Sequence, residues 1–501
     1  MLSLSRSGFL LRALVTYTGA CVLVIEILAT RILAPHFGSS LYTLSSVLGV
    51  TLGALSIGYY AGGILADRNP SWYTLGILLT FAGVTTLLIW PLSIVLLPLL
   101  GSAFASGAGP LMGSTLLFLI PCGFLGTFSP YAVGLEQRFA PALSAGRAAG
   151  NIFFWSTLGS IAGSIAAGFL LIPLLGIHIL IGNIGTSLLV IGIVIVLLNG
   201  KVKARGKGFI ISSMFIGACS LAIPYTSKAV FAVDGVYQRM IVQDTQIEDR
   251  KIRILWQDRN ASSGINLEND DHAFQYTRIV AAAWKGKEPP KRSLVIGAGA
   301  FVIPRVIAAA SPESNVDVID IEPGLEDIAK RFFRYIPSDR IHSIIADGRT
   351  FLRDSGQYDL IIGDAYQATH SIPAHLTTQE FFALVKDHLT ENGIFIGNFI
   401  GSVDTSRNSY LPAVMRTLLS VFPAGRFYAM NDSRSVAQQN VMFIACKSDP
   451  CIDPCSSAMK SSPDPILSTL CERDVPVYAA DLEDHPILTD DYAPVEWLTV
   501  Q

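Results

Sequence analysis

Charged residues are scarce in this sequence, and the scarcity is concentrated in its first half. Asp, Glu, Lys and Arg make up 15% of the 501 residues, against 51% hydrophobic residues, and the mean hydropathy is +0.47. An average soluble domain is about one quarter charged. Because long uncharged runs follow one another before residue 226, a wholly soluble protein is excluded and membrane-spanning helices are expected.

A basic excess is also missing, which argues against a nucleic-acid partner. The net charge is −3, whereas a nucleic-acid-binding domain needs a strongly basic face. A cleaved signal peptide is not expected either, because the first apolar run is too long and carries Glu26 and Arg31.

Length and composition divide the chain into parts. Since 501 residues exceed the usual size of one domain, we expect a transmembrane helical bundle over residues 1–228. A small β-rich unit is expected over 229–285, and a third domain with a cysteine-containing tail over 286–501. The lipid bilayer is therefore an expected partner, and a homodimer is compatible with the sequence.

Seven apolar stretches are candidate membrane spans. Pro91 and Pro98 could break the third of them into a helix and a re-entrant piece. The stretches are residues 9–34, 41–66, 73–99, 110–135, 148–175, 177–199 and 208–225.

Small residues recur four apart within these stretches. This spacing lets helix backbones touch, so it predicts a compact bundle, and we favour packing over a transport path as its meaning. The pairs are Gly49 and Gly53, Gly58 and Gly62, and Gly159 and Gly163.

Two ionisable residues lie inside the first stretch. Glu26 is well within it and Arg31 is near its end. An intramembrane charge usually marks function, but we favour a structural ion pair or snorkelling toward the interface, because one acid is a thin basis for a proton or substrate pathway. Both interpretations stay open.

Basic loop residues predict the orientation. All of these residues fall on the cytoplasmic side of the membrane if the amino terminus is cytoplasmic. Seven crossings then place the second half outside the cytoplasm, and six crossings, with residues 208–225 lying in the interface, keep it inside. The residues are Arg6, Arg12, Arg68, Arg138, Arg147, Lys201, Lys203, Arg205 and Lys207.

Seven cysteines are present, and four of them lie close together near the end of the chain. Two disulfides in an oxidising compartment are one interpretation, and free buried thiols in the cytosol are the other. Their spacing matches no common zinc site, so no metal is expected. Together with the charge pattern they favour an extracytoplasmic second half. The four are Cys446, Cys451, Cys455 and Cys471.

A strand-turn-helix pattern organises the second half. The apolar run 294–296 meets Gly297 and Gly299, a helix is expected over 301–310, and the β-branched run 316–319 ends in Asp320. This is the layout of a nucleotide-binding unit, in which glycines let the backbone approach a ligand and the acid holds a ribose. Val302 stands where the dinucleotide fingerprint has its third glycine. A nucleoside without a pyrophosphate therefore fits better than NAD.

Strands and helices continue to alternate after Asp320, which predicts a mostly parallel sheet with helices on both faces. Helices are expected near 325–333 and 378–389, and strands at 341–346, 358–363 and 394–399, with a turn at 391–393. The strand ends deliver Asp347 and Asp364 to the same edge as Gly297 and Asp320, where such sheets bind ligands. Before this region, alternating runs over 233–267 predict antiparallel strands, and 274–284 predicts a helix.

Several motifs occur in a specific order. The soluble part contains YQR at 237–239, the glycine turn, DG at 347–348, YDLIIGDA at 358–365 and IPAHLTTQEFF at 372–382. The membrane part contains EILATRILAPHFGSS at 26–40, GYYAGGILADRNP at 58–70 and STLGSIAGS at 156–164. In this combination the chain resembles the membrane-fused branch of the polyamine aminopropyltransferases, the spermidine synthase family. The fold class that this implies is a membrane all-α bundle, then a small antiparallel β-unit and an α/β Rossmann-like domain of the methyltransferase type.

The resemblance implies a co-substrate and residues that hold it. Family members transfer an aminopropyl group from decarboxylated S-adenosylmethionine to an amine and release methylthioadenosine, and no permanently bound cofactor is implied. By the same resemblance Asp364 is the general base, a role that suits a carboxylate at a strand end. The nucleoside-binding positions are Gln238, Gly297, Gly299, Asp320 on the ribose, Asp347 and Gly348 on the adenine, and Pro373 in the gate loop.

The acceptor side departs from the family pattern. Ala300 and Gln367 stand where the family has aspartates, and Thr277 follows Tyr276 where the family has a histidine. Aspartates there pair with polyamine ammonium groups, so their loss predicts a non-standard amine acceptor. Tyr276, Tyr366 and Gln367 are the expected acceptor contacts.

Further features near the site have no assigned role. His370 and His375 flank the gate loop and are expected to be solvated, although they could supply a base. The tail LTDDYAPVEW carries Asp490, Asp491 and Glu496 and is expected to dock against the rest of the protein.

Three functions follow as hypotheses. The first is a membrane-bound aminopropyl-type transferase. The second is an S-adenosylmethionine-dependent methyltransferase with an unknown acceptor, and the third is a non-enzymatic transporter or sensor that binds a nucleoside.

Overall fold

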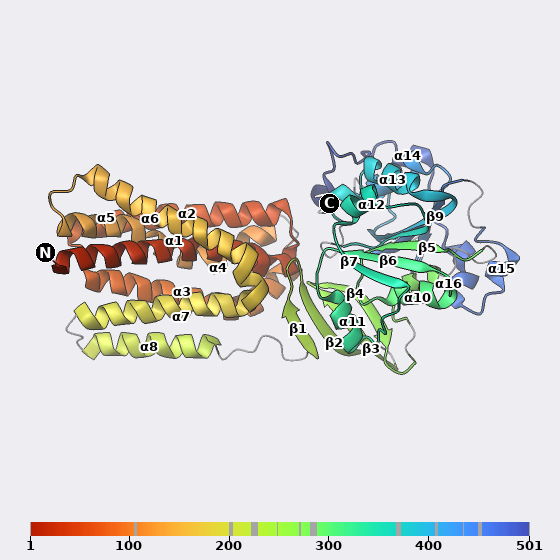
Figure 1. Ribbon diagram of the computed structural model, residues 1–501. Helices are drawn as coiled ribbons and strands as arrows, with labels where there is room; N and C mark the ends of the chain where they lie inside the picture. Colours follow the sequence, from red (N-terminus) through yellow and green to blue (C-terminus); the bar gives the residue numbers. More distant parts are fainter. Residues whose placement is uncertain are drawn as a thin grey trace. The chain divides into compact units, whose positions relative to one another are not determined.

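The computed structural model divides into two compact units, Met1–Ser227 and Lys228–Gln501 (Figure 1). We describe each unit by itself. The residues described are 2–104, 108–199, 204–221, 229–247, 249–269, 272–280, 288–366, 372–405, 409–433, 435–448 and 453–499.

The described residues of the first unit form helices joined by short connections. Within them, five helical segments are long and apolar enough to cross a membrane: Ser7–Phe37, Leu41–Arg68, Trp72–Gly101, Ala108–Phe139 and Ala145–Asn199. The helices are α1 (Leu2–Phe37), α2 (Leu41–Arg68), α3 (Trp72–Ala103), α4 (Ala108–Gly126), α5 (Phe128–Phe139), α6 (Ala145–Ala166), the π-helical turn Ala167–Leu171, α7 (Ile172–Asn199) and α8 (Ala204–Leu221).

Two of these segments differ from the expected spans. Helix α3 runs unbroken through Pro91 and Pro98, so a re-entrant piece is wrong there, and neighbouring helices make such prolines tolerable. The expected fourth span consists of α4 and α5, which meet at Thr127.

The longest helical segment contains a reversal. Gly176 has φ 73° and ψ 168° and interrupts the helical backbone. Figure 1 shows α6 and α7 running in opposite directions. A positive φ of this kind favours glycine. The fifth and sixth expected spans therefore lie on either side of Gly176, and the expected seventh falls on α8, whose apolar part is the shorter stretch Ile210–Ser220.

Small residues bring the helices together at two of the three glycine pairs, as their four-residue spacing predicts. A Cβ on Gly159 would collide with the Thr16 backbone of α1, and one on Gly58 would collide with Gly123 of α4. Gly49 and Gly53 have open space instead, so the expectation of close packing is wrong for that pair. Gly49 and Gly53 lie on an exposed face of α2.

A buried acid in this unit escaped the sequence analysis. Glu136 of α5 is 5% exposed, and its Oε1 accepts hydrogen bonds from Arg12 Nη2 of α1 at 3.3 Å and Asn151 Nδ2 of α6 at 2.5 Å. Three helices are therefore joined by one carboxylate. Glu26, in contrast, is only half-buried.

The second unit begins with a four-stranded antiparallel sheet. Its strands β1 (Phe231–Asp234), β2 (Arg239–Ile247), β3 (Arg250–Gln257) and β4 (Asn260–Asn266) pair in chain order. The helix expected over 274–284 is described only as α9 (Tyr276–Ile279), and residues 281–287 lie outside the described part.

A seven-stranded mixed sheet follows, in the order β10-β11-β9-β8-β5-β6-β7. Strands β5 to β9 pair in parallel, while β11 pairs antiparallel with β9 and β10. The strands are β5 (Arg292–Ile296), β6 (Asn315–Asp320), β7 (Ile341–Ile345), β8 (Tyr358–Gly363), β9 (Leu389–Gly401), β10 (Arg426–Ala429) and β11 (Gln439–Cys446).

Helices cover both faces of this sheet (Figure 1). One face packs on α10 (Val302–Ala310) and α11 (Leu325–Phe332), and the other on α12 (Gly348–Asp354), α13 (Gln379–Asp387) and α14 (Tyr410–Val421). The expected α/β domain is thereby confirmed. The expected turn 391–393 lies instead within β9, whose pairing jumps from Tyr358–Leu389 to Leu360–Ile394 and leaves three extra residues on β9.

The chain ends in short helices tied to this domain. They are α15 (Ser457–Lys460), α16 (Pro465–Ser468), the 3₁₀ turns Leu470–Arg473 and Ala479–Leu482, and α17 (Val495–Leu498). A disulfide joins Cys455 to Cys471, and Cys446 is also disulfide-bonded; Cys451 lies outside the described residues. Among the described cysteines, Cys21, Cys122 and Cys219 are free.

Candidate functional site

Asp364 directly follows β8 and is the centre of the site. Its Oδ1 accepts a hydrogen bond of 2.7 Å from Asn398 Nδ2 of β9, and its Oδ2 accepts one of 3.0 Å from the Tyr276 hydroxyl. Both donors are neutral, and no cation pairs with Asp364 among the described residues. The carboxylate is therefore oriented without being neutralised.

Burial sets the proton affinity of this group. Loss of water raises the pKa of Asp364 to about 7, although the hydrogen bonds from Asn398 and Tyr276 lower it. The same burial, with the nearby Asp364, holds the pKa of Tyr276 well above its usual value, so Tyr276 stays a donor. A carboxylate with a pKa near 7 can accept a proton at neutral pH.

The glycine turn between β5 and α10 lies against this acid. Gly297 has φ 106°, and a Cβ there would collide with the Asp364 backbone; Gly299 has φ 50° and faces the Ser263 side chain of β4. The turn thus needs glycine for both conformation and space. Ala300, in the same turn, is fully buried.

Asp320 at the end of β6 fixes the other side of that turn. Its Oδ2 accepts from Ala298 N at 2.8 Å and its Oδ1 from Glu322 N at 2.9 Å. Burial raises the pKa of Asp320, although these backbone donors partly counter it. Because Asp320 is held by backbone amides alone, lone pairs remain for the two hydroxyls of a ribose.

Glu322, two residues further on, was missed by the sequence analysis. It is 2% exposed, and its carboxylate accepts hydrogen bonds from the backbone N–H groups of Val236, Tyr237 and Gln238 at 2.7–2.8 Å. A buried carboxylate with three backbone donors fixes the loop between β1 and β2 over the edge of the large sheet. The only local signal was an acid immediately before Pro323.

Gln238 then connects this loop to the segment that carries Asp364 and Tyr366. Its Nε2 donates to the Tyr366 carbonyl at 2.9 Å, and its Oε1 accepts from Gln257 Nε2 at 2.8 Å. The Tyr366 hydroxyl donates to the Asn398 carbonyl at 2.9 Å. Gln238, Tyr366 and Asp364 are thus brought together, while Gln367 and His370 lie outside the described residues.

Asp347 and Gly348 lie at the end of β7 and begin α12. Asp347 Oδ1 caps the helix by accepting from Thr350 N at 2.8 Å, and Oδ2 pairs with His375 Nε2 at 2.7 Å. Burial acts to raise the pKa of Asp347, but these hydrogen bonds outweigh it and leave the pKa below its usual value. His375, expected to be solvated, is half exposed but engaged. Pro373 precedes it at the start of the 3₁₀ turn Ala374–Leu376.

The carboxyl-terminal tail docks beside this loop. Arg349 Nη1 and Nη2 donate to the two carboxylate oxygens of Asp490 at 2.7 and 2.6 Å, and Thr378 adds a third bond at 2.8 Å. The tail therefore docks on α12 and α13 of its own domain, and Asp490 makes the contacts that hold it there.

Residues 273–453 match the family model of the spermine/spermidine synthase domain. A spermidine synthase-like domain therefore lies in the second half of the chain. The polyamine aminopropyltransferase of Vibrio vulnificus (strain CMCP6) is 28% identical over 200 residues, which cover 37% of this chain and 64% of that protein. The probable polyamine aminopropyl transferase of Bifidobacterium longum (strain NCC 2705) is 25% identical over 233 residues, covering 45% of this chain and 50% of that protein.

The chain thus spans between half and two thirds of these relatives' lengths. Among solved structures, a probable spermidine synthase from Corynebacterium glutamicum ATCC 13032 superposes with a TM-score of 0.40 at 19% identity, covering 47% of this chain and 86% of that one.

Proposed function

We propose that the second half of this chain transfers an aminopropyl group from decarboxylated S-adenosylmethionine to an amine acceptor, with Asp364 as the general base. The observation that carries the proposal is the partly buried Asp364 at the carboxyl edge of the sheet, with a pKa of about 7 and two neutral donors. An alkylammonium usually loses its proton only near pH 10, so a primary amine needs such a base before it can attack.

The nucleoside end of the donor fits the carboxyl edge. Asp320 would accept the ribose hydroxyls, and the backbone of Gly297 and Gly299 would lie beside the nucleoside. Asp347 would accept a hydrogen bond from the adenine amino group through the oxygen that now pairs with His375. That oxygen would either bond both groups or exchange His375 for the adenine. Gln238 and Pro373 would complete the enclosure from the loop after β1 and from the gate loop.

The transfer itself balances without a further reagent. The acceptor ammonium gives one proton to Asp364, and the freed nitrogen lone pair attacks the aminopropyl carbon bound to the sulfonium. The carbon–sulfur bond breaks, its electron pair stays on sulfur, and methylthioadenosine leaves as a neutral thioether. Asp364 then releases its proton to solvent, and the charge of the product stays on the new ammonium.

Methylthioadenosine release by the full-length protein tests this function. With decarboxylated S-adenosylmethionine and a panel of primary amines, we expect release that falls at least about 100-fold in Asp364→Asn, because a positioned base contributes roughly that factor. Asp354→Asn, at the exposed end of α12, is the matched control. Unchanged release in Asp364→Asn would falsify the assignment of the base. Adenosylhomocysteine formed from S-adenosylmethionine would indicate a methyltransferase, and nucleoside binding without turnover a sensor or transporter.

We also propose that the second half lies outside the cytoplasm. The Cys455–Cys471 disulfide supports this side. The one-sided basic loops support it only if α8 crosses the membrane as a seventh span, because six crossings would keep the second half inside, and the apolar part of α8 is the short stretch Ile210–Ser220. Adenosylmethionine compounds are made in the cytoplasm, so an external domain requires a supply of the donor across the membrane. A reporter fused after Gln501 measures the side directly: alkaline phosphatase activity supports the proposal, and fluorescence of a cytoplasmic reporter contradicts it.

A further inference from the structure

Asn440 of β11 is hydrogen-bonded to the side chain that orients the base. Its Nδ2 donates to Asn398 Oδ1 at 2.9 Å, and Asn398 Nδ2 donates to Asp364 Oδ1 at 2.7 Å. Strand β11 pairs with β9, and β9 pairs with β8, which Asp364 follows. Two amides in a row thus lead from a third strand to the carboxylate. Neither the sequence motifs nor the family resemblance assigned a role to Asn440.

The charge of Asp364 determines which way each amide points. A side-chain amide accepts through its oxygen and donates through its nitrogen, whereas an ionised carboxylate only accepts. Asn398 must therefore turn its nitrogen toward Asp364 and its oxygen toward Asn440. Asn440 must in turn present its nitrogen. Both amides are thus oriented for the ionised form of the base.

A proton on Oδ1 of Asp364 would disrupt this arrangement. Such a proton needs an acceptor, and Asn398 could supply one only by turning its amide over. Its nitrogen would then face the nitrogen of Asn440, and two donors cannot bond each other. Because Asn398 is 2% exposed, water has little access to replace the lost bond, and an unpaired buried group is costly. Asn440 therefore keeps Oδ1 in use as an acceptor.

The other oxygen of Asp364 has a partner that can accept as well as donate. The Tyr276 hydroxyl lies 3.0 Å from Oδ2 and 3.3 Å from the carbonyl oxygen of Ser262, and it can donate to either. When Oδ2 carries a proton, this hydroxyl can donate to Ser262 and accept from Oδ2. The bond to the ionised carboxylate is charge-assisted and stronger, so Tyr276 still lowers the pKa of Asp364 on balance. Oδ2 can therefore gain a proton without leaving a buried group unpaired.

We propose that Asn440 is a positioning residue for the base: through Asn398 it holds Oδ1 of Asp364 as a hydrogen-bond acceptor, and the proton of the acceptor amine is taken on Oδ2. One N–H bond of the acceptor ammonium breaks, its electron pair stays on nitrogen for the attack on the aminopropyl carbon, and an O–H bond forms at Oδ2. The Tyr276 hydroxyl then donates to Ser262. This inference rests on the proposed function for the amine, whereas the orientation of the two amides does not.

The titratable groups beside Asp364 in the described part of the chain are two hydroxyls, those of Tyr276 and Tyr366. Burial, together with the nearby Asp364, holds the pKa of each well above its usual value. The turn after β5 presents its backbone at Gly297, and β9 presents the neutral amide of Asn398. A titration of this site near neutral pH therefore reports Asp364.

An infrared titration tests the role of Asn440 without turnover. The carboxylic C=O band of protonated Asp364 is followed against pH in the full-length protein, with Asp364→Asn as the spectrum to subtract. Asn440→Asp presents an acceptor to Asn398, turns its amide over and gives a proton on Oδ1 a partner, so the midpoint should rise by about one pH unit or more. Asn440→Leu only removes the constraint and should raise it by about half a unit.

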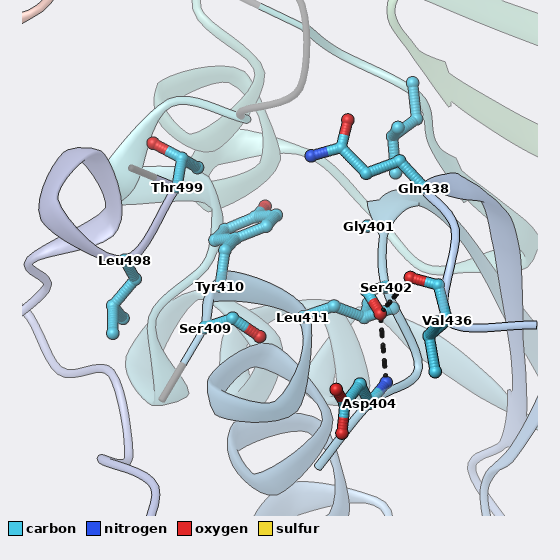
Figure 2. Close-up of a pocket in the computed structure, with 11 residues that line it drawn as sticks. Gly401, Ser402, Asp404, Ser409, Tyr410, Leu411, Val436, Gln438, Leu498 and Thr499 are labelled. Carbon is cyan, nitrogen blue, oxygen red and sulfur yellow. Dashed lines mark hydrogen bonds between the residues drawn. The ribbon is translucent and has the colours of Figure 1, made fainter. Parts of the chain in front are cut away.

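Gln438→Glu separates the orientation of the amides from an added charge. Gln438 lies two residues before Asn440 and lines a pocket of about 220 Å³ at the end of β9 (Figure 2). A carboxylate there should leave the midpoint near that of the parent protein. The inference is overturned if Asn440→Asp shifts the midpoint no further than Gln438→Glu, or if Asn440→Leu titrates like the parent.

The rate gives a second readout that a merely structural residue would not move. In Asn440→Asp, kcat/KM for methylthioadenosine release should fall about tenfold near pH 6 and recover near pH 9, because only the ionised fraction of Asp364 changes. An equal loss at both pH values would show a structural role and overturn the inference. If the parent protein releases no methylthioadenosine, the transferase function fails, and the infrared titration still decides the role of Asn440.

Discussion

Asn398 donates a hydrogen bond of 2.7 Å from its Nδ2 to Oδ1 of Asp364. Its own Oδ1 accepts from Asn440 Nδ2 at 2.9 Å, so two amides in series orient the carboxylate. With the Tyr276 hydroxyl on the other oxygen, every described donor to the Asp364 side chain is neutral. A base held in this way keeps the elevated pKa that burial gives it, whereas a cationic partner would lower it.

The rate of transfer should depend on the ionisation of Asp364. Because its pKa is about 7 and the reaction needs the ionised form, kcat/KM should fall tenfold per pH unit below that value. Tyr276→Phe removes a bond that lowers this pKa, so the acid limb should move to higher pH by about one unit. A pH–rate profile of both proteins measures the shift, and Tyr358→Phe, a buried tyrosine outside the site, is the control. An acid limb that stays in place would contradict the role of Tyr276.

Glu322 should control nucleoside binding without touching the nucleoside. Glu322→Gln presents an amide to three backbone donors and leaves part of the loop 236–238 unbound, so the affinity for methylthioadenosine should fall about tenfold. Calorimetry measures the change. Glu326→Gln, at an exposed ion pair on α11, should leave the affinity as it is. If both variants bind like the parent protein, the loop does not depend on Glu322.

Loss of the Arg349–Asp490 pair should release the carboxyl-terminal tail. Asp490→Asn should lower the free energy of unfolding by only about 1 kcal/mol, because the carboxylate is partly exposed, but should make the segment after Leu488 more sensitive to protease. The Arg349 hydrogen bond is the main cause of the lowered pKa of Asp490, so the docking holds above the usual pKa of an aspartate and is lost as pH falls through the lowered value. Asp491→Asn is the neighbouring control; equal cleavage of both variants would count against the docking.

The Cys455–Cys471 disulfide should stabilise the tail. It closes a separation of 16 residues, for which the loss of chain entropy in the unfolded state is worth about 3 kcal/mol. Replacing both cysteines by serine should lower the unfolding temperature of the second half, measured by fluorescence, whereas Cys219→Ser should not. An unchanged unfolding temperature would show that the bond adds nothing.

The elements of the α/β domain could be predicted because their signals are local. The runs 294–296, 316–319 and 358–363 are short and rich in aliphatic residues, and a glycine or an aspartate follows each, so both the strands and the residues at their carboxyl ends followed from the sequence. The bounds of β8 agree with the prediction in full. The apolar stretches were equally visible from their length, but seven spans were expected where the described residues contain five such segments, because the fifth and sixth spans form one segment and the seventh is shorter.

The contacts within the site could not be predicted, because they join residues far apart in the chain. Asn398 is 34 residues from Asp364, and Tyr276 is 88 residues from it. Glu322 looked like a second acid at a strand end, and nothing local distinguishes a carboxylate that binds three backbone amides from one that faces a ligand. Glu136 was missed for the same reason, since its partners lie on two other helices.

The antiparallel pairing of β11 with β9 has a consequence for how this domain can change. Asn398 lies opposite Met442, and Ile400 opposite Asn440, so the two amides meet diagonally across one face of the sheet. Side chains alternate between faces along a strand, and a shift of one residue would turn Asn440 away and bring Val441 into its place. Insertions or deletions between Gly401 and Gln439 can therefore vary in length only if they preserve this alignment, and β11, one strand in from the edge formed by β10, sets the orientation of the Asp364 carboxylate.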